Sequence, residues 1–462
     1  MRIAGLDQGT TSTRILLLED GAARIAQSVR HRQIYPRPGW VEHDPEELLE
    51  NLRVCLAAAE GVTAIGLANQ GESCLAWDAL TGRAISPVIV WQDNRTAAEV
   101  AALVEHGPDV MARAGLPLDA YFSASKLGWI MRNIPEAGRA LRENRLRLGT
   151  TDAFFLDRLA GVFATDVTTA SRTSLMNLET GRWDETLCRI FGVPMEALPE
   201  IRPSQGDFGE IGGISVRAAM VDQQAALYGH GCRARGDAKI TFGTGAFALT
   251  VTGEEIIRAP ERGLLPTLAW EANGARSYAV DGGVYDAGSA VEWAKRIGLF
   301  TDLSELAVFE AAPAISRGIA FVPALSGLAC PHWDRSGAGL FIGMGTGTTK
   351  QDMAQAVLEG IALRTAEVVE AMSALVPIHD RISVDGGLTR SPYFLEFLAN
   401  VLEREIACPA FDELTAFGVA SMAAGREMAR PGGIRSISPA EGPAREWRGR
   451  FEDAVARAKG WR

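Results

Sequence analysis

The stretch "IAGLDQGTTSTRILLLEDG", residues 3–21, places an acid, a glycine and four hydroxyl side chains between two short apolar runs. The runs Ile3–Leu6 and Ile15–Leu18 flank a turn that contains Gly9, a pattern typical of a β-hairpin. A tight turn at glycine exposes successive backbone N–H groups, which suit phosphate oxygens. An ordinary polar hairpin would have the same composition, because glycine and threonine are common in turns.

The side chains of this turn strengthen the phosphate interpretation. Thr10–Thr13 add hydroxyl donors, and Arg14 can offer a charged fork to the same anion. Asp7 ends the first apolar run, and a carboxylate facing the same cavity would hold Mg²⁺ directly or through water. The turn therefore predicts a site for a phosphate with its metal ion.

The pattern of strand, Gly-Thr turn and strand occurs again in "AKITFGTGAFALTVTG", residues 238–253. The turn Gly243-Thr244-Gly245 can serve further phosphates by the same backbone geometry. The two copies stand near the starts of two halves of similar size, so a duplicated architecture is the economical explanation. A third segment, "ISVDGGLTRSPYF", runs from a buried strand through Gly386-Gly387 to a helix beginning near Ser391. It can accommodate a flat ligand such as a nucleotide base, although a simple tight turn fits equally well.

Length and hydrophobic patterning predict the architecture. With 462 residues and 47% hydrophobic content, two globular domains are expected. Apolar runs typical of buried strands alternate with amphipathic helical patterns, which indicates an α/β chain. The basic, glycine-containing segment "CRARGD" marks the boundary, giving domains 1–231 and 232–429. Residues 430–462 form a C-terminal piece with a predicted amphipathic helix to about Lys459, packed on the surface or loosely ordered.

The helical patterns cover residues 45–60, 96–114, 352–375 and 393–403.

Charge and cysteine usage exclude several classes of protein. The net charge of −11 argues against a protein whose main task is to coat nucleic acid or an acidic membrane. Six scattered cysteines without a Cys-x-x-Cys pair predict free thiols in a reducing cytosol and no zinc site. The chain starts without a signal-peptide pattern, and its longest uncharged run, Gly318–Trp333, is too short to span a bilayer. We therefore expect a soluble cytoplasmic protein.

Asp222 in "AAMVDQQAALYGHG" follows a run of small residues at the predicted N-cap of a short helix. Its carboxylate can be a helix cap and nothing more. If it faces a γ-phosphate site, it can act as the general base that takes the proton of an attacking hydroxyl. The chain contains no Walker lysine motif, no His-Arg-Asp loop, no Gly-x-Ser-x-Gly elbow and no His-Glu-x-x-His helix.

Taken together, these segments resemble the FGGY carbohydrate kinases, and within them the glycerol kinases. The matching motifs occur in the family's order from residue 3 to about residue 427: "LDQGTTSTR", "QIYPRPGWVEHDPEEL", "VIVWQDNRT", "DAYFSASK", "TDAFFLDRL", "TTASRTSLMNLETGRWD", "VDQQAALYG", "FGTGAF" and "VDGG". The resemblance implies a two-domain actin-like, hexokinase-type (ribonuclease H-like) α/β fold with a duplicated ββαβαβ core. It also implies an active-site cleft between the domains that closes on substrate.

The resemblance also assigns roles to individual positions. It makes Asp222 the catalytic base and Asp7 the Mg²⁺ partner. The positions that match its ATP-binding residues are Thr10, Thr11, Arg14, Gly243, Thr244, Gly288, Gly386 and Gly387. Those that match its polyol-binding residues are Glu72, Trp91, Tyr121, Asp222, Gln223 and Phe247. Aromatic walls suit the carbon backbone of a small polyol, while carboxylates accept from its hydroxyls.

Departures from the family pattern bear on specificity. Glycerol kinases have Asn-Gln-Arg-Glu where this chain has Asn69-Gln70-Gly71-Glu72, so glycine replaces an arginine that contacts the polyol. The loss removes charged donors and opens volume, which favours a larger polyol or a ketose unless another basic group reaches in. On the nucleotide side, Ser391 and Glu292 replace an asparagine and a glutamine, so base contacts are expected to differ. The glycine- and lysine-rich loop that precedes the catalytic acid is trimmed, which makes fructose bisphosphate regulation doubtful.

The sequence thus predicts an ATP-dependent, Mg²⁺-requiring kinase that phosphorylates a primary hydroxyl of a small polyol or sugar, with glycerol as the leading candidate. One alternative is a kinase for a tetritol, a pentitol or a ketose such as xylulose. A second is an ATP-gated binding protein of the actin-like fold without kinase activity. We also expect a homo-oligomer, a dimer or tetramer, and no nucleic-acid or membrane partner.

Overall fold

The opening hairpin forms as predicted and becomes the centre of the first sheet. The computed structural model describes residues 2–19 and 21–462. In it, β1 (Arg2–Gln8) pairs antiparallel with β2 (Ser12–Glu19), which pairs antiparallel with β3 (Ala22–Arg30). On the other side, β5 (Ala64–Asn69) runs parallel to β1, and β14 (Ile214–Val221) runs parallel to β5. Every residue of β5 is buried, as its unbroken apolar sequence predicts for a central parallel strand.

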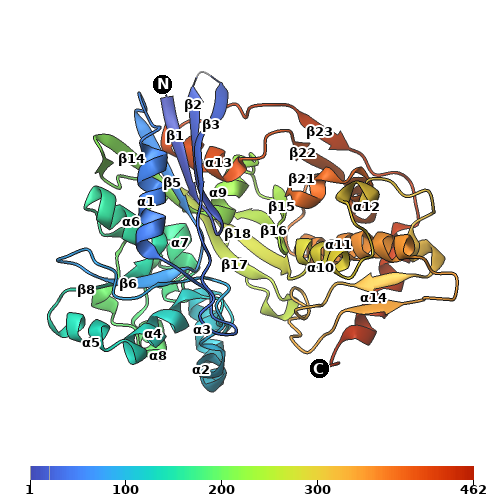
Figure 1. Cartoon of the computed structure of the whole chain (residues 1–462), viewed down its shortest axis with the longest axis horizontal. Helices are drawn as coiled ribbons and strands as arrows, with labels where there is room; N and C mark the ends of the chain where they lie inside the picture. The colour runs from blue at the N-terminus through green and yellow to red at the C-terminus, as the bar shows by residue number, and fades with distance from the viewer. Residues whose placement is uncertain (1, 20) are drawn as a thin grey trace.

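The second sheet repeats this topology. Its hairpin consists of β15 (Ala238–Phe242) and β16 (Ala246–Gly253), with β18 (Ala275–Val284) antiparallel to β16. β21 (Arg381–Gly386) and β22 (Glu405–Pro409) then continue the sheet in parallel from β15. The order β18-β16-β15-β21-β22 therefore matches β3-β2-β1-β5-β14 in sequence and direction. The duplicated architecture is confirmed as two lobes, which Figure 1 shows on the left and right.

The remaining elements complete the two sheets and cover them. β13 (Glu210–Ile211) edges the first sheet, and β17 (Leu265–Ala272) and β23 (Ile434–Ile437) edge the second. The first lobe also contains a four-stranded sheet and two pairs of short strands. The sheet consists of β4 (Glu42–His43), β7 (Val88–Ile89), β6 (Cys74–Asp78) and β8 (Leu146–Thr150). The pairs are β10 (Met176–Asn177) with β11 (Arg182–Trp183) and β12 (Glu200–Arg202) with β9 (Ala164–Asp166). The second lobe adds the pair β19 (Ala320–Val322) and β20 (Leu340–Ile342).

The helices of the first lobe are α1 (Pro45–Leu56), α2 (Ala97–Ala102), α3 (Gly107–Ala114), α4 (Ser123–Asn133), α5 (Pro135–Arg142), α6 (Thr151–Ala160), α7 (Val167–Ser171), α8 (Glu185–Phe191) and α9 (Asp222–Gly229). Those of the second part of the chain are α10 (Gly288–Arg296), α11 (Lys350–Ser373), α12 (Pro392–Leu402), α13 (Leu414–Ala424) and α14 (Ala444–Ala458). The helix predicted over 96–114 is broken into α2, a short 3₁₀ turn and α3. The break coincides with Gly107-Pro108, because proline lacks the N–H of a helix interior and favours a new first turn.

Helices α9 and α13 join the lobes. A Cβ added to Gly418 of α13 would lie 1.8 Å from the Ala225 carbonyl oxygen of α9, and one added to Gly229 would lie 2.0 Å from the Leu414 oxygen. Only glycine permits this approach of the two backbones. The apolar cluster around α13 includes Leu16 of the first sheet and Leu249 of the second, so one core connects both lobes.

The C-terminal piece is integrated into the second lobe. β23 pairs antiparallel with β22, and α14 buries Trp447 and Phe451 in the core of that lobe. Of the two expectations for this piece, packing therefore holds and a loosely ordered tail does not. The predicted boundary at 231/232 falls between the end of α9 and the start of β15, and it stays a prediction.

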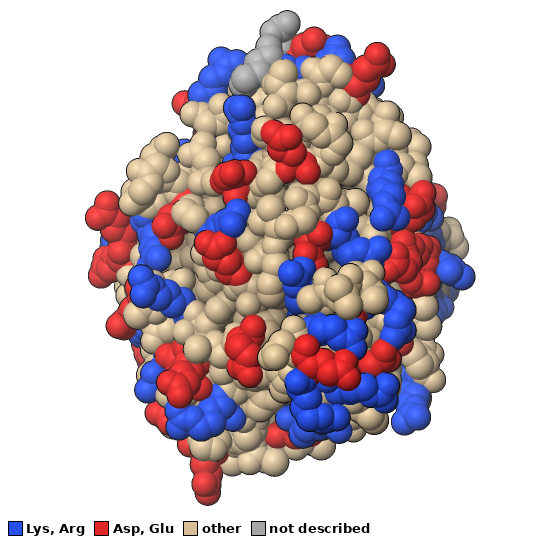
Figure 2. All heavy atoms as spheres, turned by 90° about the vertical axis from the view of Figure 1, so that its left-hand side faces the viewer, with Lys and Arg blue, Asp and Glu red and all other residues tan. Residues whose placement is uncertain are grey.

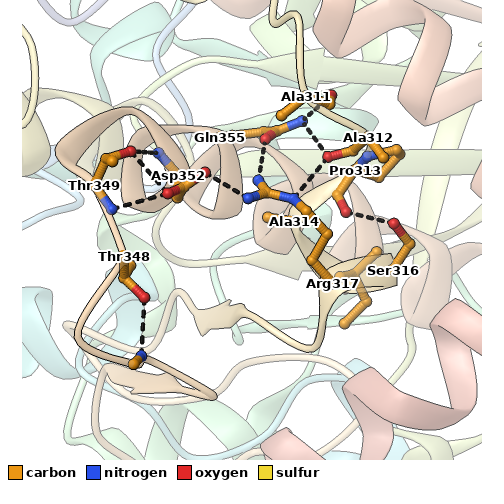
Figure 3. Close-up of polar contacts among 12 residues, drawn as sticks. Ala311, Ala312, Pro313, Ala314, Ser316, Arg317, Thr348, Thr349, Asp352 and Gln355 are labelled. Carbon is orange, nitrogen blue, oxygen red and sulfur yellow. Dashed lines mark hydrogen bonds and ion pairs between the residues drawn. The ribbon is translucent and has the colours of Figure 1, made fainter.

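A polar network anchors the start of α11 to the loop before β19. Figure 3 shows the Arg317 guanidinium between Gln355, Asp352 and the carbonyl of Ala312, with distances of 2.7, 2.5 and 3.0 Å. Thr349 caps the helix by accepting from the Asp352 N–H. The Thr349 N–H and hydroxyl in turn donate to the Asp352 carboxylate at 2.8 and 2.7 Å, and these two bonds, with the Arg317 contact, lower the pKa of Asp352 to about 2. The network fixes the long helix that backs the second sheet.

The distribution of surface charge and the state of the cysteines both bear on predictions from the sequence. Figure 2 shows acidic and basic side chains interspersed on the face it presents, so the net charge is not gathered there in one patch. All six cysteines are free and buried, as predicted. Within residues 2–19 and 21–462, no helix combines the length and apolar character that crossing a membrane requires.

Candidate active site

A pocket between the lobes collects side chains from both hairpins, and we call it the active-site pocket. Its volume is about 180 Å³. It is lined by all six residues predicted to bind a polyol and, from the two predicted phosphate turns, by Thr10, Gly243 and Thr244. The fold thus brings together residues that stand up to about 240 positions apart, although their individual roles stay predictions.

Asp222 lies at the first position of α9, and its carboxylate borders the active-site pocket. The predicted N-cap assignment is wrong, because Val221 at the end of β14 occupies the cap and offers no side-chain hydrogen bond. The carboxylate instead accepts from the adjacent Gln223 N–H at 2.7 Å. Burial raises the pKa of Asp222 to about 6, although this bond and the charges of Lys239 and Arg172 lower it. The carboxylate is therefore ionised at neutral pH and weakly basic.

The first turn presents fewer hydroxyls than the sequence predicts. Ser12 and Thr13 belong to β2 and are buried, which leaves Thr10 and Thr11 on the open side. The Thr10 hydroxyl accepts from the Trp91 indole N–H at 3.0 Å, so it also forms part of the wall of the active-site pocket. Thr11 is exposed and does not line that pocket.

The two charged residues of the first hairpin, Asp7 and Arg14, face different partners. They are paired across β1 and β2, and Arg14 Nη1 lies 3.1 Å from a Glu413 carboxylate oxygen at the start of α13. Burial and the nearby Asp222 charge raise the pKa of Asp7 to about 7. Two half-buried carboxylates that repel each other attract a cation.

The second turn is built for close backbone packing. The Gly288 N–H donates to the Gly243 carbonyl at 3.0 Å, and a Cβ at Gly288 would lie 2.4 Å from that oxygen. Gly386 has φ +98°, and a Cβ there would lie 2.2 Å from the Phe242 oxygen. A Cβ at Gly387 would meet nothing within 4 Å. The predicted nucleotide side thus combines two obligatory glycines with one that leaves an open approach.

The two predicted substitutions near the base behave differently. The Ser391 hydroxyl caps α12, accepting from the Phe394 N–H and donating to the Leu306 carbonyl at 2.7 Å. It is therefore committed within the protein. Glu292 is exposed on α10.

The residues predicted to bind the polyol form an aromatic side and an acidic side of the active-site pocket. The Trp91 and Tyr121 rings meet edge to face with centroids 5.6 Å apart, and Phe247 lies across the same pocket. Glu72 has φ +57°, a strained conformation for a side chain other than glycine. Burial raises the pKa of Glu72 to about 7 against the opposing charge of Arg172.

Arg172 lines the active-site pocket, and sequence reasoning missed it as a site residue. It follows α7, its Nε donates to Glu72 at 2.8 Å, and its Nη2 lies 3.3 Å from an Asp281 carboxylate oxygen. Only the match to the segment "TTASRTSLMNLETGRWD" hinted at it, since Arg172 and Glu72 are 100 residues apart. A Cβ added to Gly71 would lie 2.8 Å from Val221 Cγ2, so Val221 fills the space beside that glycine. Arg172 is thus a basic side chain that extends into the active-site pocket, where glycine replaces the family's arginine.

A further buried cation, Lys239, supports the acid side of the active-site pocket. Its ammonium donates to Gln223 Oε1 at 2.6 Å and to Thr241 Oγ1 at 2.9 Å. Burial lowers the pKa of Lys239, while Asp385 and Asp222 raise it. Lys239 thereby orients Gln223, one of the predicted polyol contacts.

Comparison with known proteins agrees with this geometry. The family model for the N-terminal domain of the FGGY family of carbohydrate kinases matches residues 2–229, and that for the C-terminal domain matches residues 238–426. The glycerol kinase of Thermus brockianus is 41% identical over 99% of both chains. That of Haloferax volcanii is 39% identical over 90% of this chain and 88% of its own. The crystal structure of Plasmodium falciparum glycerol kinase with ADP superposes with a TM-score of 0.90 at 28% identity, covering 99% and 98% of the two chains.

Proposed function

The chain belongs to the FGGY family of carbohydrate kinases, and from this premise we propose that it transfers the γ-phosphoryl group of ATP to a primary hydroxyl of a small polyol. Glycerol is the leading single substrate, because the glycerol kinases compared above match nearly the whole chain. One observation carries the proposal. The half-buried Asp222 carboxylate borders a pocket that also contains Thr10, Gly243 and Thr244 from both turns.

In the proposed mechanism, Asp222 orients the acceptor hydroxyl and receives its proton as the oxygen attacks phosphorus. A pKa of about 6 keeps this carboxylate ionised at neutral pH. Glu72 and Gln223 form hydrogen bonds with the other hydroxyls of the polyol, and Trp91 and Tyr121 cover its carbon chain. Backbone N–H groups of the Gly243-Thr244 turn receive the phosphate oxygens. Closure of the two lobes excludes water that would otherwise hydrolyse ATP.

The residues present suit a magnesium ion bound together with ATP. The half-buried carboxylates of Asp7 and Asp222 repel each other, and one or two carboxylates with phosphate oxygens are a typical Mg²⁺ environment. Among residues 2–19 and 21–462 no three His, Cys, Asp or Glu side chains form a protein cage for a metal. We assign Asp7 as the protein partner, and the ion supplies charge neutralisation on the phosphates when bound.

The first test is ADP release from ATP and Mg²⁺ in the presence of glycerol, comparing the wild-type protein with Asp222→Asn. We expect the substitution to lower kcat by about 10²- to 10⁴-fold, because it removes the base and keeps the shape. Asp109→Asn, an exposed acid on α3, serves as the matched control and should leave kcat unchanged. Full activity in Asp222→Asn would rule out its role as the base, and no polyol-stimulated ADP release in the wild type would refute the proposed function.

Two finer expectations accompany this function. We propose a homo-oligomer, a dimer or tetramer, which light scattering of the purified protein tests directly. We also retain a cytoplasmic location as a prediction, testable by cell fractionation.

A further inference from the structure

The active-site pocket continues into a second cavity, which we call the far chamber. The two cavities share Tyr121, Arg172, Phe247 and Asp281 as lining residues. The far chamber has a volume of about 70 Å³. A cavity needs about 10–15 Å³ on the same measure to hold one water molecule, so there is room for several groups of that size.

The far chamber lies on the side of the active-site pocket away from the phosphate turns. Asp222, Gly243 and Thr244 line the active-site pocket and are not among the residues that line the far chamber. A polyol with its reacting hydroxyl at Asp222 that extends away from the phosphate turns would reach the shared wall of Arg172 and Tyr121.

Two polar groups at the far chamber have no hydrogen-bond partner among the described residues. Arg172 is 7% exposed, and its Nη1 is unpaired although Nε and Nη2 contact Glu72 and Asp281. The Tyr285 hydroxyl is also buried without a partner. Buried donors left unpaired are costly, and a ligand hydroxyl at either group would remove the cost.

The remaining lining residues suit an uncharged, hydroxylated ligand. The Arg335 guanidinium lies over the Tyr285 ring at 4.2 Å and pairs with Asp119 at 3.0 Å. Asp119 belongs to the first lobe and Arg335 to the second, so the pair closes the far chamber across the cleft. The lining contains two arginines, Arg172 and Arg335, and two aspartates, Asp119 and Asp281. Their charges balance, and the two carboxylates disfavour an anionic ligand. Trp333 adds a second aromatic face beside Tyr285.

We propose that the far chamber binds the distal end of an acyclic polyol longer than glycerol by one or two hydroxylated carbons. The proposal rests on the proposed function and extends its acceptors from glycerol to tetritols and pentitols. Arg172 Nη1 and the Tyr285 hydroxyl donate to the distal hydroxyls, and Trp333 packs against the carbon chain. Because each added CHOH unit contributes two heavy atoms, one or two such units match the volume of the far chamber.

The test compares kcat/KM for glycerol, erythritol, threitol, ribitol, arabitol and xylitol in the wild type and two variants. Ala329→Leu adds bulk to the far chamber, and Tyr285→Phe removes its unpaired hydroxyl without adding bulk. In the wild type, at least one four- or five-carbon polyol should be phosphorylated with a kcat/KM within about tenfold of that for glycerol. Ala329→Leu should lower kcat/KM for that polyol by at least about tenfold while glycerol kinetics stay the same, and Tyr285→Phe should raise KM for the longer polyol alone. Ala102→Leu, at an exposed position of α2, is the matched control.

The outcomes separate this inference from the proposed function. Turnover of glycerol alone, or turnover of a longer polyol that both variants leave unchanged, rules out the far chamber as a binding site but leaves the proposed kinase activity standing. If Ala329→Leu does not fold, Tyr285→Phe still decides, because it only deletes one oxygen. No turnover of any polyol overturns the proposed function itself.

Discussion

At the scale of single residues, the site depends on charges that only the folded chain brings together. Asp7, Glu72 and Asp222 follow from short sequence patterns or from the resemblance, since each lies in a recognisable motif. Arg172 could not be placed at the site from sequence, because its contact with Glu72 spans 100 residues. The same holds for the Val221 methyl group that occupies the space beside Gly71.

The pH dependence of catalysis should report on Asp222 and Glu72. Their raised pKa values of about 6 and about 7 mean that kcat/KM with saturating ATP and Mg²⁺ falls as pH drops below about 7, where these carboxylates become protonated. Because Arg172 lowers both pKa values, Arg172→Gln should move the acidic limb to higher pH. Profiles between pH 5 and 8.5 check both statements. Arg113→Gln, whose partner Asp184 lies outside the active-site pocket, should leave the limb in place, and an unmoved limb in Arg172→Gln would contradict the coupling.

At the scale of elements, long apolar runs in the sequence predicted the secondary structure correctly. Short or interrupted elements could not be predicted in this way. The two hairpins, the apolar run over residues 64–68 that forms most of β5, and the helices that became α11 and α12 follow from hydrophobic patterning. Two-residue strands such as β4 and β7 contain too few positions to show any alternation, so their sheet was not predictable. The packing of α14 was left open, because an amphipathic pattern does not identify the surface that it covers.

The close contact of α9 and α13 predicts an unusual cost for one methyl group. Gly418→Ala should lower the free energy of unfolding by about 1–3 kcal/mol, because the added Cβ collides with the Ala225 carbonyl. Gly449→Ala is the matched control, a glycine inside α14 whose Cβ would meet nothing within 4 Å. It should gain about 0.5–1 kcal/mol from helix propensity. Urea denaturation of both variants measures the difference, and equal stabilities would contradict the packing argument.

At the scale of the whole molecule, the duplicated lobes place two similar turns on opposite sides of one pocket. The repeated strand order explains why the Gly9 and Gly243 turns meet there, each at the end of the first strand of its sheet. Their similarity in sequence was enough to predict the duplication. It was insufficient to predict the far chamber, which needs loops from both lobes, including the segment with Trp333 and Arg335.

The most direct test of the central claim follows phosphorus by ³¹P NMR in a mixture of ATP, Mg²⁺, glycerol and a catalytic amount of the protein. Transfer to a primary hydroxyl predicts a new phosphomonoester signal, split by two neighbouring CH₂ protons, that grows in step with ADP. Because the proposed closure of the lobes would exclude water, little inorganic phosphate should form. Repeating the experiment with a tetritol or a pentitol tests phosphoryl transfer whatever the length of the polyol. ADP accompanied by inorganic phosphate and no ester with any polyol would mean an ATPase, and would contradict the account.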